Sequence, residues 1–90
     1  MKTTLVVDGR KCTSPANTAA EFTSSLGLSR PWQGNLDALD DMLYGGFGTP
    51  EGGFLLVWNH SKRSEAALGP LFQKLVVVIR NHDDIELQLK

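Results

Sequence analysis

The chain has 90 residues, of which 41% are hydrophobic, and its formal net charge is −1. This length suits a single domain over residues 1–90, and no stretch approaches the ~18 consecutive apolar residues that a membrane span needs. The near-neutral charge supplies no basic field for nucleic acid, so we expect neither a nucleic-acid nor a membrane partner. The one cysteine, Cys12, excludes an internal disulfide and a thiolate metal cage, and we expect it to behave as a small buried apolar residue. Because the apolar run at residues 5–7 is too short for a secretory signal peptide, we expect a cytoplasmic protein.

The N-terminal part of the chain predicts a strand followed by a helix. Residues 3–7 are rich in β-branched side chains and stop at a turn signal, which indicates a strand. Ser14 and Pro15 then supply an N-cap and a first-turn proline for a helix over residues 14–26. Gly27 follows as a natural left-handed cap.

The most informative segment comes after a loop at residues 30–34 and reads as a helix from the N-cap Asn35 to about Tyr44. At ~100° per residue its apolar side and its acidic side separate cleanly. The apolar side holds Leu36, Leu39, Met42 and Leu43, and the acidic side holds Asp37, Asp40, Asp41 and Tyr44. Aspartate is a mediocre helix former, and like charges one turn apart destabilise a helix. The acidic side therefore indicates a function, namely recognition by a cationic group.

A glycine-rich loop and a second strand follow. Five glycines and Pro50 within residues 45–53 exclude a regular element. The glycines lack the Gly-Lys-Ser/Thr ending of a phosphate-binding loop and do not match Gly-x-Gly-x-x-Gly, so we expect no nucleotide cofactor. The continuous apolar run at residues 54–58 predicts a central strand covered on both faces, with Trp58 in the core.

The last third of the chain leaves one element open. Ser61 or Ser64 could begin a short helix that ends before Gly69-Pro70. Residues 71–80 favour a strand by local propensity but also keep helical spacing, and we take the helix.

Residues 85–89 alternate apolar and polar, as in a strand with one wet face. The connection lengths then predict an α/β fold with a mainly parallel three-stranded sheet and helices packed on it.

A resemblance to a known family is carried by the run Trp32-Gln33-Gly34-Asn35-Leu36-Asp37-Ala38-Leu39-Asp40-Asp41-Met42-Leu43. This run resembles the signature of the barstar family, small cytoplasmic inhibitors of secreted barnase-type ribonucleases. The resemblance implies a parallel sheet in the order 1-2-3 with about four helices, and it supports the helix at residues 71–80. It also implies a non-enzymatic protein without cofactors that is a monomer when free and forms a 1:1 complex with a guanyl-preferring ribonuclease.

In this family the acidic helix plugs the enzyme's active-site cleft, where a carboxylate replaces a substrate phosphate. Carried over by position, that carboxylate is Asp41, supported by Asp37. The chemistry fits, because arginine, lysine and histidine that bind phosphate can donate the same charge-assisted hydrogen bonds to a carboxylate. The resemblance predicts a set of partner-binding residues: Trp32, Gln33, Asn35, Leu36, Asp37, Asp40, Asp41, Tyr44, Gly45, Gly46 and Phe47.

Several positions depart from the family pattern. Asp40 and Gly46 each stand where the family has a tryptophan, although Phe47 could supply an aromatic ring one position later. Pro31 stands where the family has a contact tyrosine, and Val77 where it offers a glutamate to the enzyme's edge. The central acidic pair is intact, but the aromatic and acidic residues around it are changed. The partner could therefore be a different ribonuclease of the same type.

Each candidate also has a simpler structural explanation. Asp37 lies in the first turn, where a carboxylate stabilises the helix dipole, and Asp40 could be a solvated charge. Trp32 could only hold the loop against the core, although an aromatic residue beside a helix end is also a typical interface anchor. His60 and His82 are separate and have no nearby cluster of acids or cysteines at ligand spacing, so we expect no metal site. A second hypothesis is a non-enzymatic adaptor that docks another basic protein surface.

Overall fold

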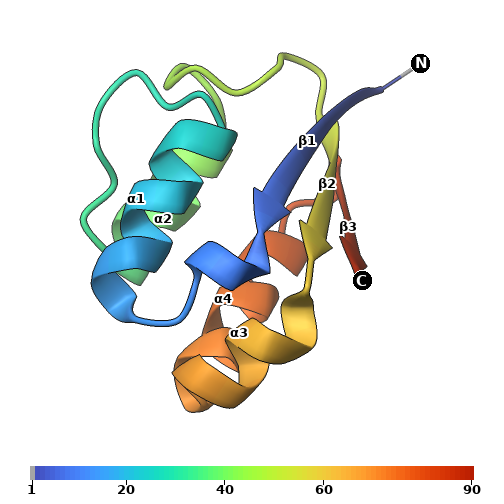
Figure 1. Ribbon diagram of the computed structural model, residues 1–90. Coiled ribbons are helices and arrows are strands. Elements are labelled where there is room, and N and C mark those ends of the chain that lie inside the picture. Colours follow the sequence, from blue (N-terminus) through green and yellow to red (C-terminus); the bar gives the residue numbers. More distant parts are fainter. Residues whose placement is uncertain (1) are drawn as a thin grey trace.

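The computed structural model describes residues 2–90, in which three strands and four α-helices are joined by short connections and two longer loops (Figure 1). The strands form a parallel sheet in the order β1-β2-β3. These findings confirm the predicted α/β fold with a three-stranded parallel sheet. The elements are β1 (Thr3–Asp8), the 3₁₀ helix η1 (Gly9–Lys11), α1 (Pro15–Ser25), α2 (Leu36–Leu43), β2 (Phe54–Asn59), α3 (Ser61–Leu68), α4 (Pro70–Arg80) and β3 (Ile85–Leu89).

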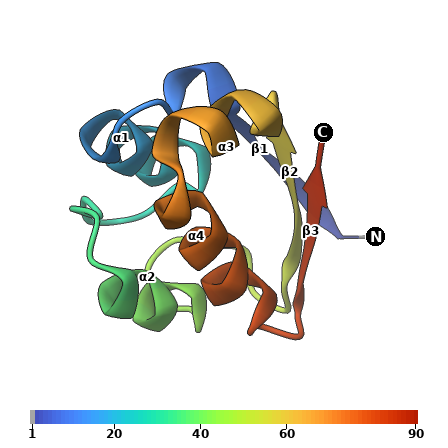
Figure 2. The same cartoon turned by 90° about the horizontal axis from the view of Figure 1, so that it is seen from below.

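All four α-helices lie on one face of the sheet, as Figure 2 shows. On that face the side chains of Phe54, Leu56 and Trp58 are fully buried. The alternate residues of β2 point to the open face, where Leu55 is half-buried and Val57 is 8% exposed. None of the four α-helices covers this face in Figure 2, so the prediction that residues 54–58 are covered on both faces is wrong, although Val57 is still buried by its neighbours in the sheet. The run is apolar throughout because β2 is the central strand and is flanked on both sides.

The helix boundaries follow the predicted caps closely at α1. The Ser14 hydroxyl accepts a hydrogen bond from the Asn17 backbone N–H at 3.2 Å, and the Asn17 side chain accepts one from the Ser14 N–H at 2.8 Å. This reciprocal pair and Pro15 fix the start of the helix. Gly27 has a φ of 65° and ends it, as predicted.

The structure shows a helix at residues 71–80, for which local propensity favoured a strand. Residues 71–80 belong to α4, whose buried residues Phe72, Leu75, Val76 and Ile79 form one stripe at helical spacing. Burial of this stripe outweighs the β-propensity of its valines. Helix α3 begins at Ser61 and ends at Leu68, as predicted, and the residue at its N-cap position precedes both serines. That position is His60, which has a left-handed φ of 52° and makes no side-chain capping bond.

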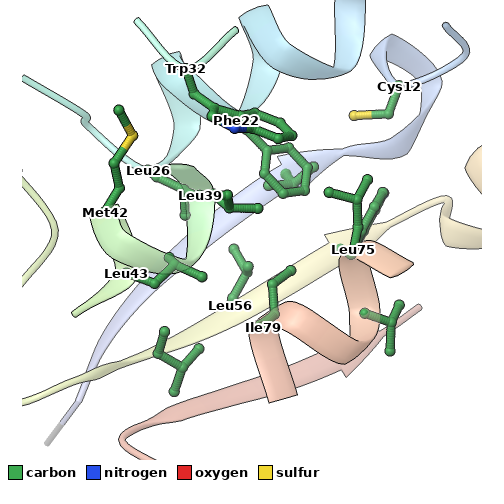
Figure 3. Packing of buried hydrophobic residues seen from close by; sticks show 14 of the residues in the cluster. Cys12, Phe22, Leu26, Trp32, Leu39, Met42, Leu43, Leu56, Leu75 and Ile79 are labelled. Atoms are coloured by element: carbon green, nitrogen blue, oxygen red, sulfur yellow. The ribbon is translucent and has the colours of Figure 1, made fainter. Parts of the chain in front are cut away.

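The core lies between the sheet and the helices, and Figure 3 shows labelled residues of α1, α2 and α4 converging there on Leu56 of β2. The Phe22 ring packs against Trp32 and Trp58 at centroid distances of 5.5 and 5.2 Å. The Trp58 indole N–H donates to the Ser64 hydroxyl, which itself donates to the Gly9 carbonyl oxygen. Trp58 is thus a core residue, as predicted, and its polar atom is satisfied. Within residues 2–90 no helix is long and apolar enough to cross a membrane.

Candidate partner-binding site

Helix α2 is held on the core by its apolar side. Its Asn35 N-cap accepts a hydrogen bond from the Ala38 N–H at 2.9 Å, as the sequence predicts. Leu39, Met42 and Leu43 are buried, and Figure 3 shows Leu39 and Leu43 on the same interior side as Leu56 and Ile79. The opposite side of the helix is consequently turned outward.

The loop before α2 is fixed by Trp32. Its indole N–H donates to the Asn35 carbonyl oxygen at 2.7 Å, and its backbone N–H donates to the Thr23 hydroxyl at 2.9 Å. The side chain is only 4% exposed and lies against Phe22. Trp32 therefore supports the loop from the core, which favours the simpler explanation over that of an exposed interface anchor. Its neighbour Gln33 is exposed.

The loop after α2 begins with exposed residues and is then joined to the loop that precedes the helix. Tyr44 is 75% exposed, and Gly45 and Gly46 are exposed as well. Phe47 is half-buried; its carbonyl oxygen accepts a hydrogen bond from the Ser29 N–H at 2.6 Å.

Gly48 brings the two loops into backbone contact. It has a φ of 111°, and a Cβ there would overlap the Gly27 carbonyl oxygen. Only glycine fits this contact, so Gly48 helps to lock the loops on either side of α2 together.

The three aspartates of α2 have different environments. Asp37 and Asp41 are exposed, and no cationic side chain among residues 2–90 lies within ion-pair distance of either one. Asp40 is different, because its Oδ1 lies 2.8 Å from Nε2 of His82. The acidic side of the helix therefore presents two carboxylates without a cationic partner among residues 2–90, Asp37 and Asp41, and a third, Asp40, that is bonded to His82.

His82 was missed as a functional candidate by the sequence reasoning. Its side chain is 2% exposed, while that of Asp40 is 38% exposed. The two residues are 42 positions apart, and no local pattern around His82 indicates the contact. Only a prediction of how α2 packs beside the turn between α4 and β3 could have found it.

Comparison with known proteins identifies the family. The model for "Barstar (barnase inhibitor)" matches residues 2–88, nearly the whole chain. The protein belongs to the barstar family. No curated protein matches the chain. Barstar-family proteins are inhibitors and not enzymes, so membership indicates an inhibitor of a barnase-type ribonuclease.

The departures from the barstar pattern cluster around α2. Pro31 and Gly46 are exposed in the flanking loops. Val77 of α4 is 57% exposed and lines an apolar groove of about 380 Å³ between α2 and α4. The groove is lined by Leu36, Asp37, Gln73, Lys74, Val77 and Val78. One edge of the barstar-like surface is therefore apolar at the position where the family pattern carries a glutamate.

The groups whose pKa is shifted lie in the N-terminal segment and not on α2. The guanidinium of Arg10, bonded to Asp8 at 3.1 Å, lowers the pKa of the Asp8 carboxyl. Burial raises the pKa of the Cys12 thiol to about 12, so the thiol is protonated and unreactive at neutral pH. Within residues 2–90, no three histidine, cysteine or acidic side chains gather closely enough to hold a metal ion.

Proposed function

We propose that this protein inhibits a secreted, guanyl-preferring ribonuclease of the barnase type by inserting α2 into the enzyme's basic active-site cleft. In this proposal the Asp41 carboxylate takes the place of a substrate phosphate and Asp37 supports it one turn away. The observation that carries the proposal is the exposure of both carboxylates without any cationic partner among residues 2–90. A carboxylate pair that no internal cation neutralises is available to an external one.

Preorganisation supports the same mechanism. A ribonuclease cleft directs several cationic donors at one phosphate, and a carboxylate on a rigid helix can accept these charge-assisted bonds without further ordering. Helix α2 meets this need because its N-cap is satisfied and its apolar side is buried. The rigid placement reduces the conformational entropy lost on binding.

The residues around the pair supply the rest of the proposed contact surface. Asn35 and Leu36 lie at the start of α2, and Tyr44, Gly45 and Gly46 at its exit. Gln33 and Phe47 extend the surface into the loops, whereas Trp32 acts from beneath by fixing the Asn35 carbonyl. We further propose that the protein acts as a cytoplasmic monomer and forms a 1:1 complex.

Inhibition of purified ribonucleases tests the proposal. Barnase and related guanyl-preferring enzymes would be assayed with micromolar inhibitor at low ionic strength, where exposed charges are least screened. Inhibition of at least one enzyme is expected, and Asp41→Ala should raise the inhibition constant at least about 100-fold. Glu86→Gln is the matched control, because it removes one negative charge from the open face of the sheet, away from α2. Equal losses for both variants would mean that only net charge matters.

A second candidate is a non-enzymatic adaptor that docks another basic surface through the exposed carboxylates Asp37 and Asp41, with the groove beside α2 as an added apolar contact. Affinity capture from the native cell, with salt elution and mass spectrometry, separates the two. Recovery of a ribonuclease supports inhibition. Recovery of another protein whose binding also depends on Asp41, without any ribonuclease, supports the adaptor.

A further inference from the structure

Asp40, His82 and Tyr44 form a compact group at the end of α2 that the proposed phosphate mimicry does not use. We call it the His82 cluster. The His82 ring is buried, and its Nε2 lies 2.8 Å from Oδ1 of Asp40. The Tyr44 ring meets the His82 ring edge-on, with centroids 4.5 Å apart. Both ends of the last turn of α2 therefore contact one imidazole.

The chemistry of the pair fixes the direction of the hydrogen bond. An ionised carboxylate has only acceptors, so Nε2 of His82 carries a proton and donates a hydrogen bond to Oδ1 of Asp40. A hydrogen bond to a charged group is among the stronger kinds, and burial of the imidazole keeps water from competing for its N–H. Asp40 is thus engaged within the protein.

The backbone hydrogen bonds of His82 show that the histidine is held more firmly than the helix it contacts. The His82 N–H donates to the Ile79 carbonyl oxygen at 3.2 Å, and the His82 carbonyl oxygen accepts from the Ile85 N–H at 3.1 Å. These bonds tie the histidine to the end of α4 and the start of β3. Helix α2, by contrast, is only eight residues long and lies between two loops. The sheet-anchored histidine supports the helix.

We propose that His82 is a positioning residue for the acidic helix. By holding Asp40 inward and packing against Tyr44, it fixes the last turn of α2 and hence the direction in which Asp41 points. A partner then meets two available carboxylates, Asp37 and Asp41, with the Tyr44 ring beside them. The consequence for inhibition rests on the proposed function, whereas the positioning itself is testable on the free protein.

Amide hydrogen exchange of the full chain, measured by NMR without any ribonuclease, tests the positioning. His82→Leu removes the donor, and His82→Gln keeps a side-chain N–H that can reach the carboxylate. The leucine variant should speed exchange of the amides of residues 40–44 at least tenfold more than those of α1. The glutamine variant should recover most of this protection. An equal change in both helices, or no recovery with glutamine, would overturn the proposal.

Two further measurements test the positioning even if His82→Leu does not fold. Asp40→Leu removes the acceptor from the half-exposed side and should give the same selective loss in α2, whereas Asp40→Asn keeps an acceptor oxygen and should retain the protection. Nitrogen-15 NMR of the imidazole should show a protonated Nε2, and a ring protonated only at Nδ1 would overturn the assignment. Because no ribonuclease is present, these failures are distinct from a failure of the inhibition assay.

Discussion

Asp40 and Asp41 are neighbours in α2 but are expected to have different roles: loss of Asp41 should weaken ribonuclease binding, and loss of Asp40 should lower the stability of the fold. Asp41 is exposed and has no cationic partner among residues 2–90, so Asp41→Ala should change the free energy of unfolding by less than about 0.5 kcal/mol. The same change should weaken ribonuclease binding by about 3–5 kcal/mol, because the enzyme's phosphate-binding cations are then buried without a counter-charge. At 1.4 kcal/mol per factor of ten, the dissociation constant rises roughly 10²- to 10⁴-fold.

Asp40→Ala should show the reverse pattern. It leaves the buried Nε2–H of His82 without its acceptor, which costs about 1–3 kcal/mol of stability. For a domain of this size, each kcal/mol lowers Tm by roughly 4–8 °C. Binding should weaken less than about tenfold, because only the positioning of the last turn is disturbed. A destabilised variant that still binds is therefore expected.

Circular dichroism melts and stopped-flow binding to an inhibited ribonuclease measure both effects on the same preparations. Glu86→Gln serves as the control for loss of one charge far from α2. If the two alanine variants lose affinity equally, the transfer of the phosphate-mimicking role to Asp41 is wrong. If Asp41→Ala loses more thermal stability than Asp40→Ala, the internal role assigned to Asp40 is wrong.

Three other predictions concern the loops, the buried thiol and the charge. Gly48→Ala should destabilise the fold by about 1–3 kcal/mol or more in urea denaturation, whereas Gly46→Ala, which meets nothing within 4 Å, should cost less; equal costs would refute the backbone contact with Gly27. At pH 8 the native Cys12 thiol, with its pKa raised from 9.0 to about 12, should react with iodoacetamide at least ~100-fold more slowly than in urea, and comparable rates would contradict its burial. Raising salt from low to high concentration should slow ribonuclease association while changing dissociation little, as expected when exposed carboxylates steer the encounter; a salt-independent association rate would argue against this steering.

Most of the fold could be predicted from local patterns. The caps Ser14 and Asn35 and the apolar stripe of α2 each indicate an element, and each is present in the structure. The segment of α4 was harder because its valines favour a strand, and burial of one face decided the matter. The one-sided cover of β2 could not be predicted, since an apolar run does not reveal which neighbours bury it.

The candidate site was less accessible to sequence reasoning. Periodicity placed the aspartates on the outward side of α2, but it could not show that Asp40 is bonded to His82 across 42 positions of sequence. The sequence likewise could not show whether Trp32 is exposed or buried. In the structure it is buried, and its indole N–H is bonded to the Asn35 carbonyl oxygen. The Asp40–His82 bond joins segments that no local pattern connects, and the burial of Trp32 depends on how its loop packs against Phe22 of α1.

Competition for the ribonuclease active site tests the central claim most directly. The inhibition constant of the wild-type protein would be measured for an inhibited barnase-type enzyme at increasing concentrations of a guanosine mononucleotide, which occupies the phosphate-binding cleft. If α2 fills that cleft, the apparent inhibition constant should rise in proportion to nucleotide concentration. An inhibition constant that does not depend on the nucleotide would contradict the account.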